Sequence, residues 1–249
     1  MGLLDNIVSF WKLDEASGNR VDAVVASGND LTSNNSVGQG SGIIGSSAQF
    51  NAASSRYLSR ASNSSLQLGN VDFTISAWVN FDSLPASTDQ GYQIVTKDSD
   101  AANSRDYTID YNNFHTGGYQ FRLYMDGDFS LVTKPAVGLV TTVATGAWIF
   151  IITWVDSAAK IAYMQMNNGT VQSSSYTTAP TNVSSAEFRI GARVYSGYQE
   201  YFDGRIDEVG FWKRVLSAEE RSQLYNGGAG FPFPFLMPHP PSFQPFLAQ

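Results

Sequence analysis

The carboxylate groups of Asp and Glu are the side chains of this chain that could carry out catalysis. Pairs of them hydrolyse glycosidic bonds when they lie about 5–5.5 Å apart, for retention, or roughly 6.5–9.5 Å apart, for inversion. The chain has six glutamates: Glu15, Glu187, Glu200, Glu208, Glu219 and Glu220. Asp207 and Glu208 come closest to such a pair, but neighbours in a regular strand point to opposite faces. The spacing favours acidic residues that hold the ends of a strand, so we predict no catalytic residue and do not expect an enzyme.

The two histidines, His115 and His239, cannot build a multi-histidine metal centre. His239 lies among prolines, and no motif supports a Ser-His-Asp triad through His115. The glycine-rich run GQGSG, Gly38–Gly42, has no lysine and does not open a helix, so it is not a nucleotide-binding loop.

Tyrosines in two glycine-containing segments are the candidate ligand-binding residues. The first segment, YSGYQEY, contains Tyr195, Tyr198 and Tyr201, and the second, FHTGGY, contains His115 and Tyr119. Aromatic faces can stack on sugar rings while neighbouring polar groups bond the hydroxyls. Loop tyrosines can equally pack half-buried over the ends of a sheet, because they are amphipathic. Both interpretations stay open at this stage.

Charge and hydropathy exclude several classes of partner. The formal net charge is −7, and the sequence holds no run of Lys or Arg. Neutralising phosphates requires such residues, so we expect neither a nucleic acid nor an anionic membrane as a partner. The longest apolar run, Trp148–Val155, is far shorter than the ~20 residues of a membrane helix. Residues 1–6 lack a basic region followed by a long apolar region, so we expect synthesis and folding in a cytoplasm.

Alternation of apolar and polar residues predicts strands throughout the chain. Phe73, Ile75, Ala77, Val79 and Phe81 would line one face of a strand. The run Trp148–Val155 is apolar on both faces, which predicts a central strand covered on both sides. Many short strands without interleaved helices favour an all-β, antiparallel two-sheet sandwich.

One short helix is predicted near the C-terminus. Ser217, followed three residues later by Glu220, forms a capping box, and Asn226-Gly227-Gly228 would end the helix. No charged residue follows Arg221, so we place a domain boundary at residue 228.

Four stretches together resemble the laminin-G-like, concanavalin-A-like family of jelly-roll domains. They are VSFWKLDEASGNRVDAVVASGNDLT (Val8–Thr32), VDFTISAWVNF (Val71–Phe81) with IVTKDSD (Ile94–Asp100), WIFIITWVDSAAKIAYMQMNNG (Trp148–Gly169), and RIGARVYSGYQEYFDGRIDEVGFWKRVLSAEERSQLYNGG (Arg189–Gly228). They occur in the family's order. The resemblance implies a jelly-roll sandwich over residues 1–228, with its N- and C-terminal strands adjacent.

The resemblance also bears on catalysis and on calcium. Enzymatic branches of the superfamily place carboxylates in a Glu-x-Asp-x-x-Glu pattern, which this chain lacks. Many relatives carry Ca²⁺, for which Asp22, Asn29, Asp30, Asp207 and the run Asp98-x-Asp100-x-x-Asn103 offer oxygens. That run lacks the glycine and the terminal glutamate of a calcium loop, and turn Asp and Asn side chains also cap backbone. We assign no cofactor and no metal ligand, with Ca²⁺ as the alternative.

The last 20 residues, Gly230–Gln249, contain six prolines, five phenylalanines and no charged residue. Proline excludes helix and central strand and favours an extended path. Exposed phenylalanines would be poorly tolerated, so their own domain or another subunit must cover them. We expect residues 229–249 to form an arm that docks on a second copy or another subunit through these side chains: Phe231, Phe233, Phe235, Phe243 and Phe246.

These features predict a non-enzymatic structural or decorating protein of a virion, such as a phage capsid or tail, assembled in the host cytoplasm. Its sandwich would be displayed outward and could bind surface glycans. The alternative is an extracellular carbohydrate-binding or adhesion module of a bacterium. A polysaccharide-degrading enzyme is the third interpretation.

Overall fold

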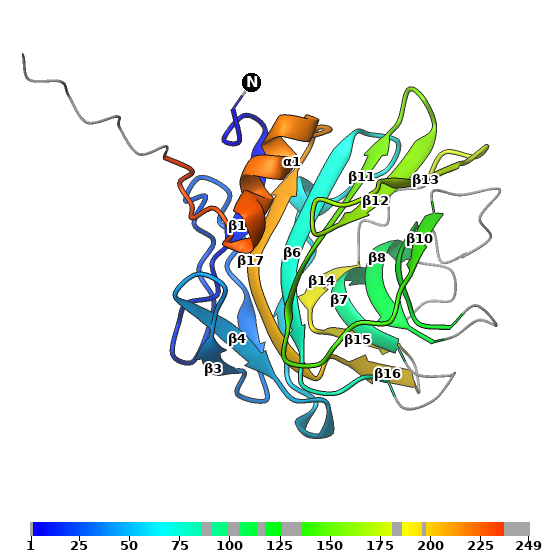
Figure 1. Ribbon diagram of the computed structural model, residues 1–249. Helices are drawn as coiled ribbons and strands as arrows, with labels where there is room; N and C mark the ends of the chain where they lie inside the picture. Colours follow the sequence, from blue (N-terminus) through cyan, green and yellow to red (C-terminus); the bar gives the residue numbers. More distant parts are fainter. Residues whose placement is uncertain are drawn as a thin grey trace, which may run out of the picture.

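The computed structural model describes residues 2–85, 91–98, 105–113, 118–125, 136–180, 186–195 and 198–236, with the backbone alone at 105, 136, 194, 195, 198 and 199. Two antiparallel sheets face each other across a hydrophobic core (Figure 1). The predicted all-β sandwich is therefore confirmed.

The larger sheet has eight strands in the order β13-β12-β11-β6-β17-β4-β3, with β1 also paired to β17. Its strands are β1 (Ile7–Trp11), β3 (Gly38–Ser41), β4 (Ser46–Phe50), β6 (Phe73–Phe81), β11 (Trp148–Asp156), β12 (Ile161–Met166), β13 (Gln172–Ser175) and β17 (Gly204–Trp212). The pairing of β1 with β17 brings the first and last strands together, as the resemblance implied.

The second sheet has seven strands in the order β10-β9-β8-β7-β14-β5-β2. They are β2 (Thr32–Asn34), β5 (Tyr57–Arg60), β7 (Gly91–Asp98), β8 (Arg105–Asn112), β9 (Gln120–Met125), β10 (Ala136–Val140) and β14 (Glu187–Ile190). A separate hairpin of β15 (Ala192–Tyr195) and β16 (Tyr198–Tyr201) packs against β7.

Helices contribute little to the described chain. The α-helix α1 (Ala218–Tyr225) starts at the Ser217 cap, whose hydroxyl accepts the Glu220 N–H at 3.3 Å while the Glu220 carboxylate accepts the Ser217 N–H at 2.8 Å. The predicted capping box is thus present. Three 3₁₀ turns cover Ala52–Ser54, Ser64–Leu66 and Asn226–Gly228. No described helix is long and apolar enough to cross a membrane.

One end of the outer face of the eight-stranded sheet is covered by α1, which lies across β17 and β6 (Figure 1). The Tyr225 ring stacks on Trp78 with centroids 5.8 Å apart and contacts Phe150 at 6.1 Å. The Arg221 guanidinium lies 4.1 Å from the Trp154 ring centroid. The strand β11 is apolar on both faces because the core covers one face and this second apolar cluster covers the other.

The first part of the C-terminal segment packs on its own sandwich. The Phe233 and Phe235 rings lie 5.3 and 5.1 Å from the Phe10 ring, and Phe231 contacts Phe235 at 5.8 Å. All three phenylalanines of this segment are half-buried. The boundary expected at residue 228 therefore separates residues that are in contact. Phe243 and Phe246 lie outside the described residues.

Candidate functional site

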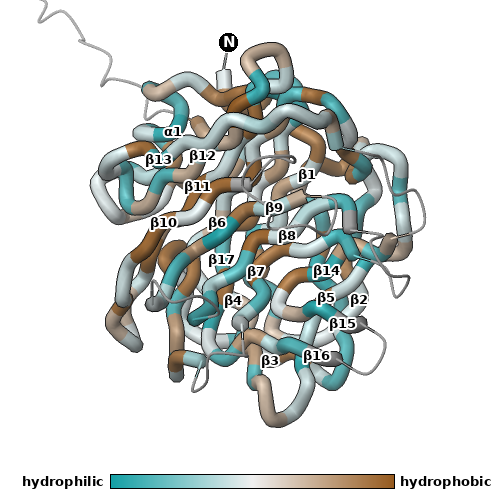
Figure 2. Tube along the Cα trace, turned by 90° about the vertical axis from the view of Figure 1, so that its right-hand side faces the viewer, coloured by the Kyte–Doolittle hydropathy of each residue, from teal (hydrophilic) through white to brown (hydrophobic). Residues whose placement is uncertain are grey.

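The outer face of the seven-stranded sheet is polar. Apolar side chains of β7, β8 and β9 belong to the core, and hydrophilic residues stand between them along these strands (Figure 2). The Asp110 carboxylate accepts from the Arg122 guanidinium at 2.9 and 2.6 Å, and also from Asn112 at 2.7 Å. These residues are buried, so the paired charges and their hydrogen bonds stabilise one another in a region of low dielectric.

The β15–β16 hairpin is fixed to this face by charged and polar groups. Arg193 on β15 donates to the Asp98 carboxylate at 2.7 Å and lies 3.8 Å from Glu200 on β16. The Glu200 carboxylate accepts from Gln93 at 2.6 Å, and the Thr96 hydroxyl donates to the Ala192 carbonyl at 2.9 Å. The charges of the hairpin therefore hold it against β7, and nothing in their sequence spacing indicated these partners.

The first predicted tyrosine cluster lies on this hairpin. Tyr195 and Tyr198 are register partners beside its turn, although their side chains lie outside the described part. The Tyr201 ring is half-buried and its centroid lies 6.1 Å from that of Tyr57 on β5. The rings of Tyr201 and Tyr57, which are far apart in the sequence, thus lie close together beside the charged residues that hold the hairpin.

Tyr57 was missed by the sequence analysis, because a lone tyrosine in a short strand carries no local signal of a site. The Glu187 carboxylate and the Arg189 guanidinium form an ion pair of 2.8 Å on the adjacent strand β14. Burial raises the pKa of the Tyr57 hydroxyl, and the nearby Glu187 carboxylate adds to this. Tyr57 therefore stays a neutral hydrogen-bonding group at neutral pH.

The second predicted cluster has a different setting. The Tyr119 ring stacks on the buried Tyr111 ring with centroids 5.6 Å apart, and its hydroxyl donates to the Pro85 carbonyl at 2.7 Å. Both the ring and the hydroxyl of Tyr119 thus have partners within the protein, and a ligand-binding role for this residue stays a prediction. His115 and His239 lie outside the described residues.

The oxygens considered for calcium bind donors of the protein. Asp22 accepts the N–H groups of Phe10 and Val24, and the Asn29 amide oxygen accepts from the Asn63 amide at 2.9 Å. Asp30 accepts the Asp22 N–H at 2.9 Å. In the part of the chain that the structure describes, no three His, Asp or Glu side chains are grouped to hold a metal ion. Asp100 and Asn103 lie outside it.

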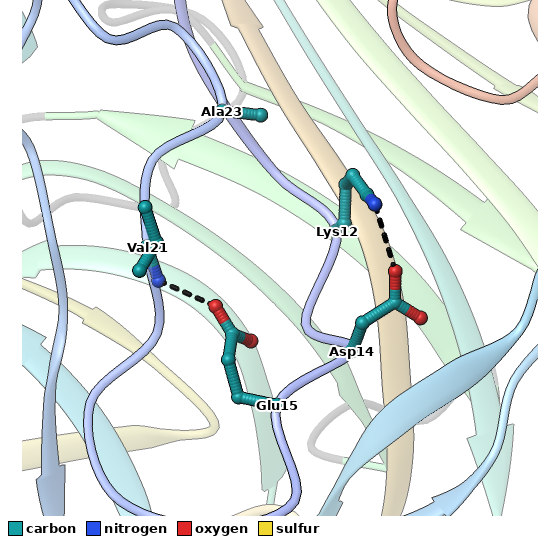
Figure 3. A pocket seen from close by; sticks show the side chains of 5 residues that line it. All are labelled: Lys12, Asp14, Glu15, Val21 and Ala23. Carbon is teal, nitrogen blue, oxygen red and sulfur yellow. Dashed lines mark hydrogen bonds and ion pairs between the residues drawn. The ribbon is translucent and has the colours of Figure 1, made fainter.

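A pocket of about 360 Å³ lies beside the end of β1 (Figure 3). Lys12 and Asp14 form an ion pair of 3.0 Å at its wall, and Glu15 accepts the Val21 N–H at 2.7 Å. Asp14 also accepts the Ser46 N–H at 2.9 Å. The acidic groups of this pocket thus hold neighbouring loops together.

Asp207 and Glu208 lie near this pocket in an irregular part of β17. Glu208 has a φ of 48°, and the register with β6 shifts between Asp207 and Gly210. The alternation of a regular strand, on which we predicted opposite faces for the two carboxyls, is therefore interrupted. Asp207 accepts the N–H groups of Ile43 and Ile44, at 2.9 and 3.3 Å, whereas both Glu208 oxygens are buried without a hydrogen-bond partner.

The pKa values of both carboxyls lie well above the ordinary range of Asp and Glu. Burial raises the pKa of Asp207 to about 8, although three backbone N–H donors oppose this. Burial and the Asp207 and Asp14 carboxylates raise the pKa of Glu208 to about 9. A neutral carboxyl costs far less to bury than a carboxylate, which accounts for an unpartnered side chain here.

The chain belongs to the concanavalin A-like lectin/glucanase superfamily, whose laminin-G-type family model matches residues 51–220. Two facing antiparallel sheets, with the first and last strands paired, agree with this assignment. Among curated proteins, no sequence matches this chain.

Solved structures share the fold at low sequence identity. Domain 4 of the extracellular arabinanase AbnA from Geobacillus stearothermophilus, in complex with arabinotriose, is 17% identical with a TM-score of 0.64, and the match covers 88% of this chain and 97% of that domain. The binding domain of Paraclostridial Mosquitocidal Protein 1 is 16% identical with a TM-score of 0.65, and the match covers 90% of this chain and 52% of that one. Trypanosoma rangeli sialidase is 13% identical with a TM-score of 0.61, over 90% of this chain and 33% of the sialidase. The chain thus spans about half of the toxin domain and a third of the sialidase.

Proposed function

We propose that this chain is a non-catalytic carbohydrate-binding domain whose ligand contacts the β15–β16 hairpin. One observation carries the proposal: charged side chains hold this tyrosine-rich hairpin against β7. Arg193 forms an ion pair with Asp98, and the Glu200 carboxylate accepts a hydrogen bond from Gln93. A binding group held by packing and by supporting hydrogen bonds loses little entropy when its ligand binds. Tyr201 and Tyr57 supply aromatic faces, and Glu187 and Arg189 supply polar groups for hydroxyls.

Two structural neighbours support a glycan as the ligand class. The arabinanase domain was solved in complex with arabinotriose, and the binding domain of a botulinum neurotoxin DC, 12% identical with a TM-score of 0.59, in complex with SialylT. Both are similar to this chain in fold alone, so the glycan itself has to be found by experiment.

The hairpin site predicts a clear result on a glycan array. Wild-type protein should bind a subset of glycans, and Tyr198→Ala and Tyr201→Ala should each weaken that binding about tenfold or more, because a sugar–aromatic contact is lost. Tyr119→Phe removes a hydroxyl that donates to Pro85 and serves as the matched control, with binding unchanged.

A hydrolysis assay distinguishes a binding module from an enzyme: the protein is incubated with the glycans that it binds, and chromatography detects any products. Intact glycans after prolonged incubation are expected. Released products that persist in the Tyr198→Ala protein would instead favour a polysaccharide-degrading enzyme. Absence of binding to any glycan would contradict the hairpin site.

The second part of the proposal is that the domain is a structural or decorating component of a virion, such as a phage capsid or tail, and binds host-surface glycans there. The apolar, uncharged C-terminal segment supports it, since Leu236, at the end of the described part, is 73% exposed. A secreted or cell-surface adhesion module is the alternative. Mass measurement of the particle in which the native protein occurs distinguishes a virion from a free module.

A further inference from the structure

A second arrangement of aromatic and charged groups lies on the outer face of the other sheet. Trp148 on β11 and Arg205 on β17 are both register partners of Asn80 on β6, which lies between them. The Arg205 guanidinium carbon lies 5.6 Å from the centroid of the Trp148 ring, and both side chains are half-buried. Arg205 is the register partner of Gln49 on β4 and lies beside Gly40 on β3, and Trp148 borders the apolar cluster on the same face. The helix α1 covers that cluster farther along the strands (Figure 1).

Arg205 is held in one position by its surroundings. Its guanidinium donates to the Asn80 amide oxygen at 3.0 Å and to the Ser41 carbonyl at 3.2 Å. A Cβ atom on Gly40 would lie 2.8 Å from the Arg205 Cδ atom, so the Arg205 side chain can pack this closely against the backbone of residue 40 only because that residue is a glycine. The GQGSG run that does not bind a nucleotide thus forms part of an edge strand, β3, against which Arg205 lies.

The positive charge of Arg205 is not neutralised within the described residues. No Asp or Glu carboxylate among them lies within 4.0 Å of its guanidinium. Gln49, the register partner of Arg205 on β4, donates through its side-chain amide to the Asp82 carboxylate at 2.8 Å. A half-buried charge with only neutral hydrogen-bond partners costs free energy. The buried Arg122 and Arg214 are each paired with a carboxylate, whereas the half-buried Arg221, over the Trp154 ring, is like Arg205 in having no carboxylate within 4.0 Å among the described residues.

We propose that Trp148 and Arg205 bind the carboxylate-bearing sugar of an acidic glycan. The guanidinium still has donors for a carboxylate, which its planar fork matches in geometry. The indole ring beside it offers an apolar surface for the sugar ring that carries the carboxylate. A small inorganic anion would use the guanidinium but not the indole, so the pairing of the two favours an acidic sugar. This site lies on the sheet opposite the β15–β16 hairpin and does not depend on the hairpin site.

The test is isothermal titration calorimetry, which measures the affinity of the protein for matched acidic and neutral probes. The pairs are 3′-sialyllactose with lactose, and trigalacturonate with its carboxyl-reduced form. We expect at least one acidic probe to bind and its neutral partner to bind about tenfold more weakly or not at all. Arg205→Gln should weaken the acidic probe about tenfold or more, and Arg205→Lys should restore part of the affinity, because an ammonium keeps the charge without the fork.

Trp148→Ala should also weaken the acidic probe. Lys160→Gln is the charge-matched control, since Lys160 is exposed on another part of the surface, and it should leave the affinity unchanged. Binding should weaken as salt rises from about 0.05 to about 0.5 M, because screening of a surface charge increases over that range.

Arg205 could instead only brace β3 against the sheet, and thermal unfolding identifies that case. An Arg205→Gln protein with a lowered Tm but undiminished affinity for the acidic probe overturns the proposal. Equal affinity for the acidic and neutral probes also overturns it, and so does a failure of the protein to bind either acidic probe. If Arg205→Gln fails to fold, the Trp148→Ala protein and the salt dependence decide. Tyr201→Ala is expected to leave this affinity unchanged, so failure of one site is distinguishable from failure of the other.

Discussion

Glu208 is a buried carboxyl whose environment disfavours its charged form. The residue is 4% exposed, both of its carboxyl oxygens are buried without a hydrogen-bond partner, and its backbone is left-handed with a φ of 48°. Its raised pKa means that the folded protein binds a proton that the unfolded chain releases near pH 4–5. The contribution of Glu208 to stability is therefore complete below the unfolded pKa and is lost as pH rises toward about 9.

Replacing Glu208 by Gln tests this assignment. Since the amide cannot ionise, Glu208→Gln should be more stable than wild type at pH 8–9 and should lose less stability between pH 5 and pH 9. Each kcal/mol corresponds to about 2–4 °C in Tm for a chain of this size. Thermal unfolding followed by circular dichroism at several pH values measures the effect. Parallel pH profiles for the two proteins would show that Glu208 is not the titrating group.

At the scale of elements, the segment after α1 behaves as part of the sandwich. Gly230 is buried with a φ of 71°, and a Cβ atom there would lie 2.9 Å from Ile44. Asn226 donates to the Gly230 carbonyl at 2.7 Å, and the Phe235 N–H donates to the Pro232 carbonyl at 2.8 Å. The chain thus turns back so that Phe233 and Phe235 contact Phe10, and Phe231 packs against Phe235.

Two truncations separate the packed part of this segment from the rest. A chain ending at residue 228 should unfold about 6–12 °C lower, since three half-buried phenylalanines are lost, at roughly 1 kcal/mol each. A chain ending at residue 236 keeps these contacts and should unfold with the full-length protein. Equal Tm values for all three chains would contradict the packing of the segment on Phe10.

At the scale of the whole molecule, assembly through the C-terminus stays a prediction for the residues after 236. Their sequence, MPHPPSFQPFLAQ, has no charge and includes Phe243 and Phe246. If they bind another subunit, the full chain should form a larger particle than the chain ending at residue 236, as measured by multi-angle light scattering. Identical masses for the two, in the absence and presence of other components of the native particle, would rule out this arm as the assembly contact.

The family fold followed from sequence because each element carries its own local signal. The alternation in β6, the two apolar faces of β11 and the Ser217–Glu220 capping box all arise from residues within one strand or one turn. Such patterns state which face of an element is buried, so sheets and helix were predictable without a partner for any of them.

The sites depended on tertiary structure, because register between strands distant in sequence brings their residues together. Tyr201 meets Tyr57 across 144 positions of sequence, 201 minus 57, and Arg205 meets Trp148 through Asn80. The irregular register at Glu208 and the return of Phe231–Phe235 onto Phe10 likewise have no local pattern. The sequence by itself determined the sandwich and its chemistry-bearing residue types. Only the tertiary structure decided which of these residues share a surface. Their proximity depends on the pairing of strands that are distant in sequence, and loop-closure entropy and core packing together select that pairing.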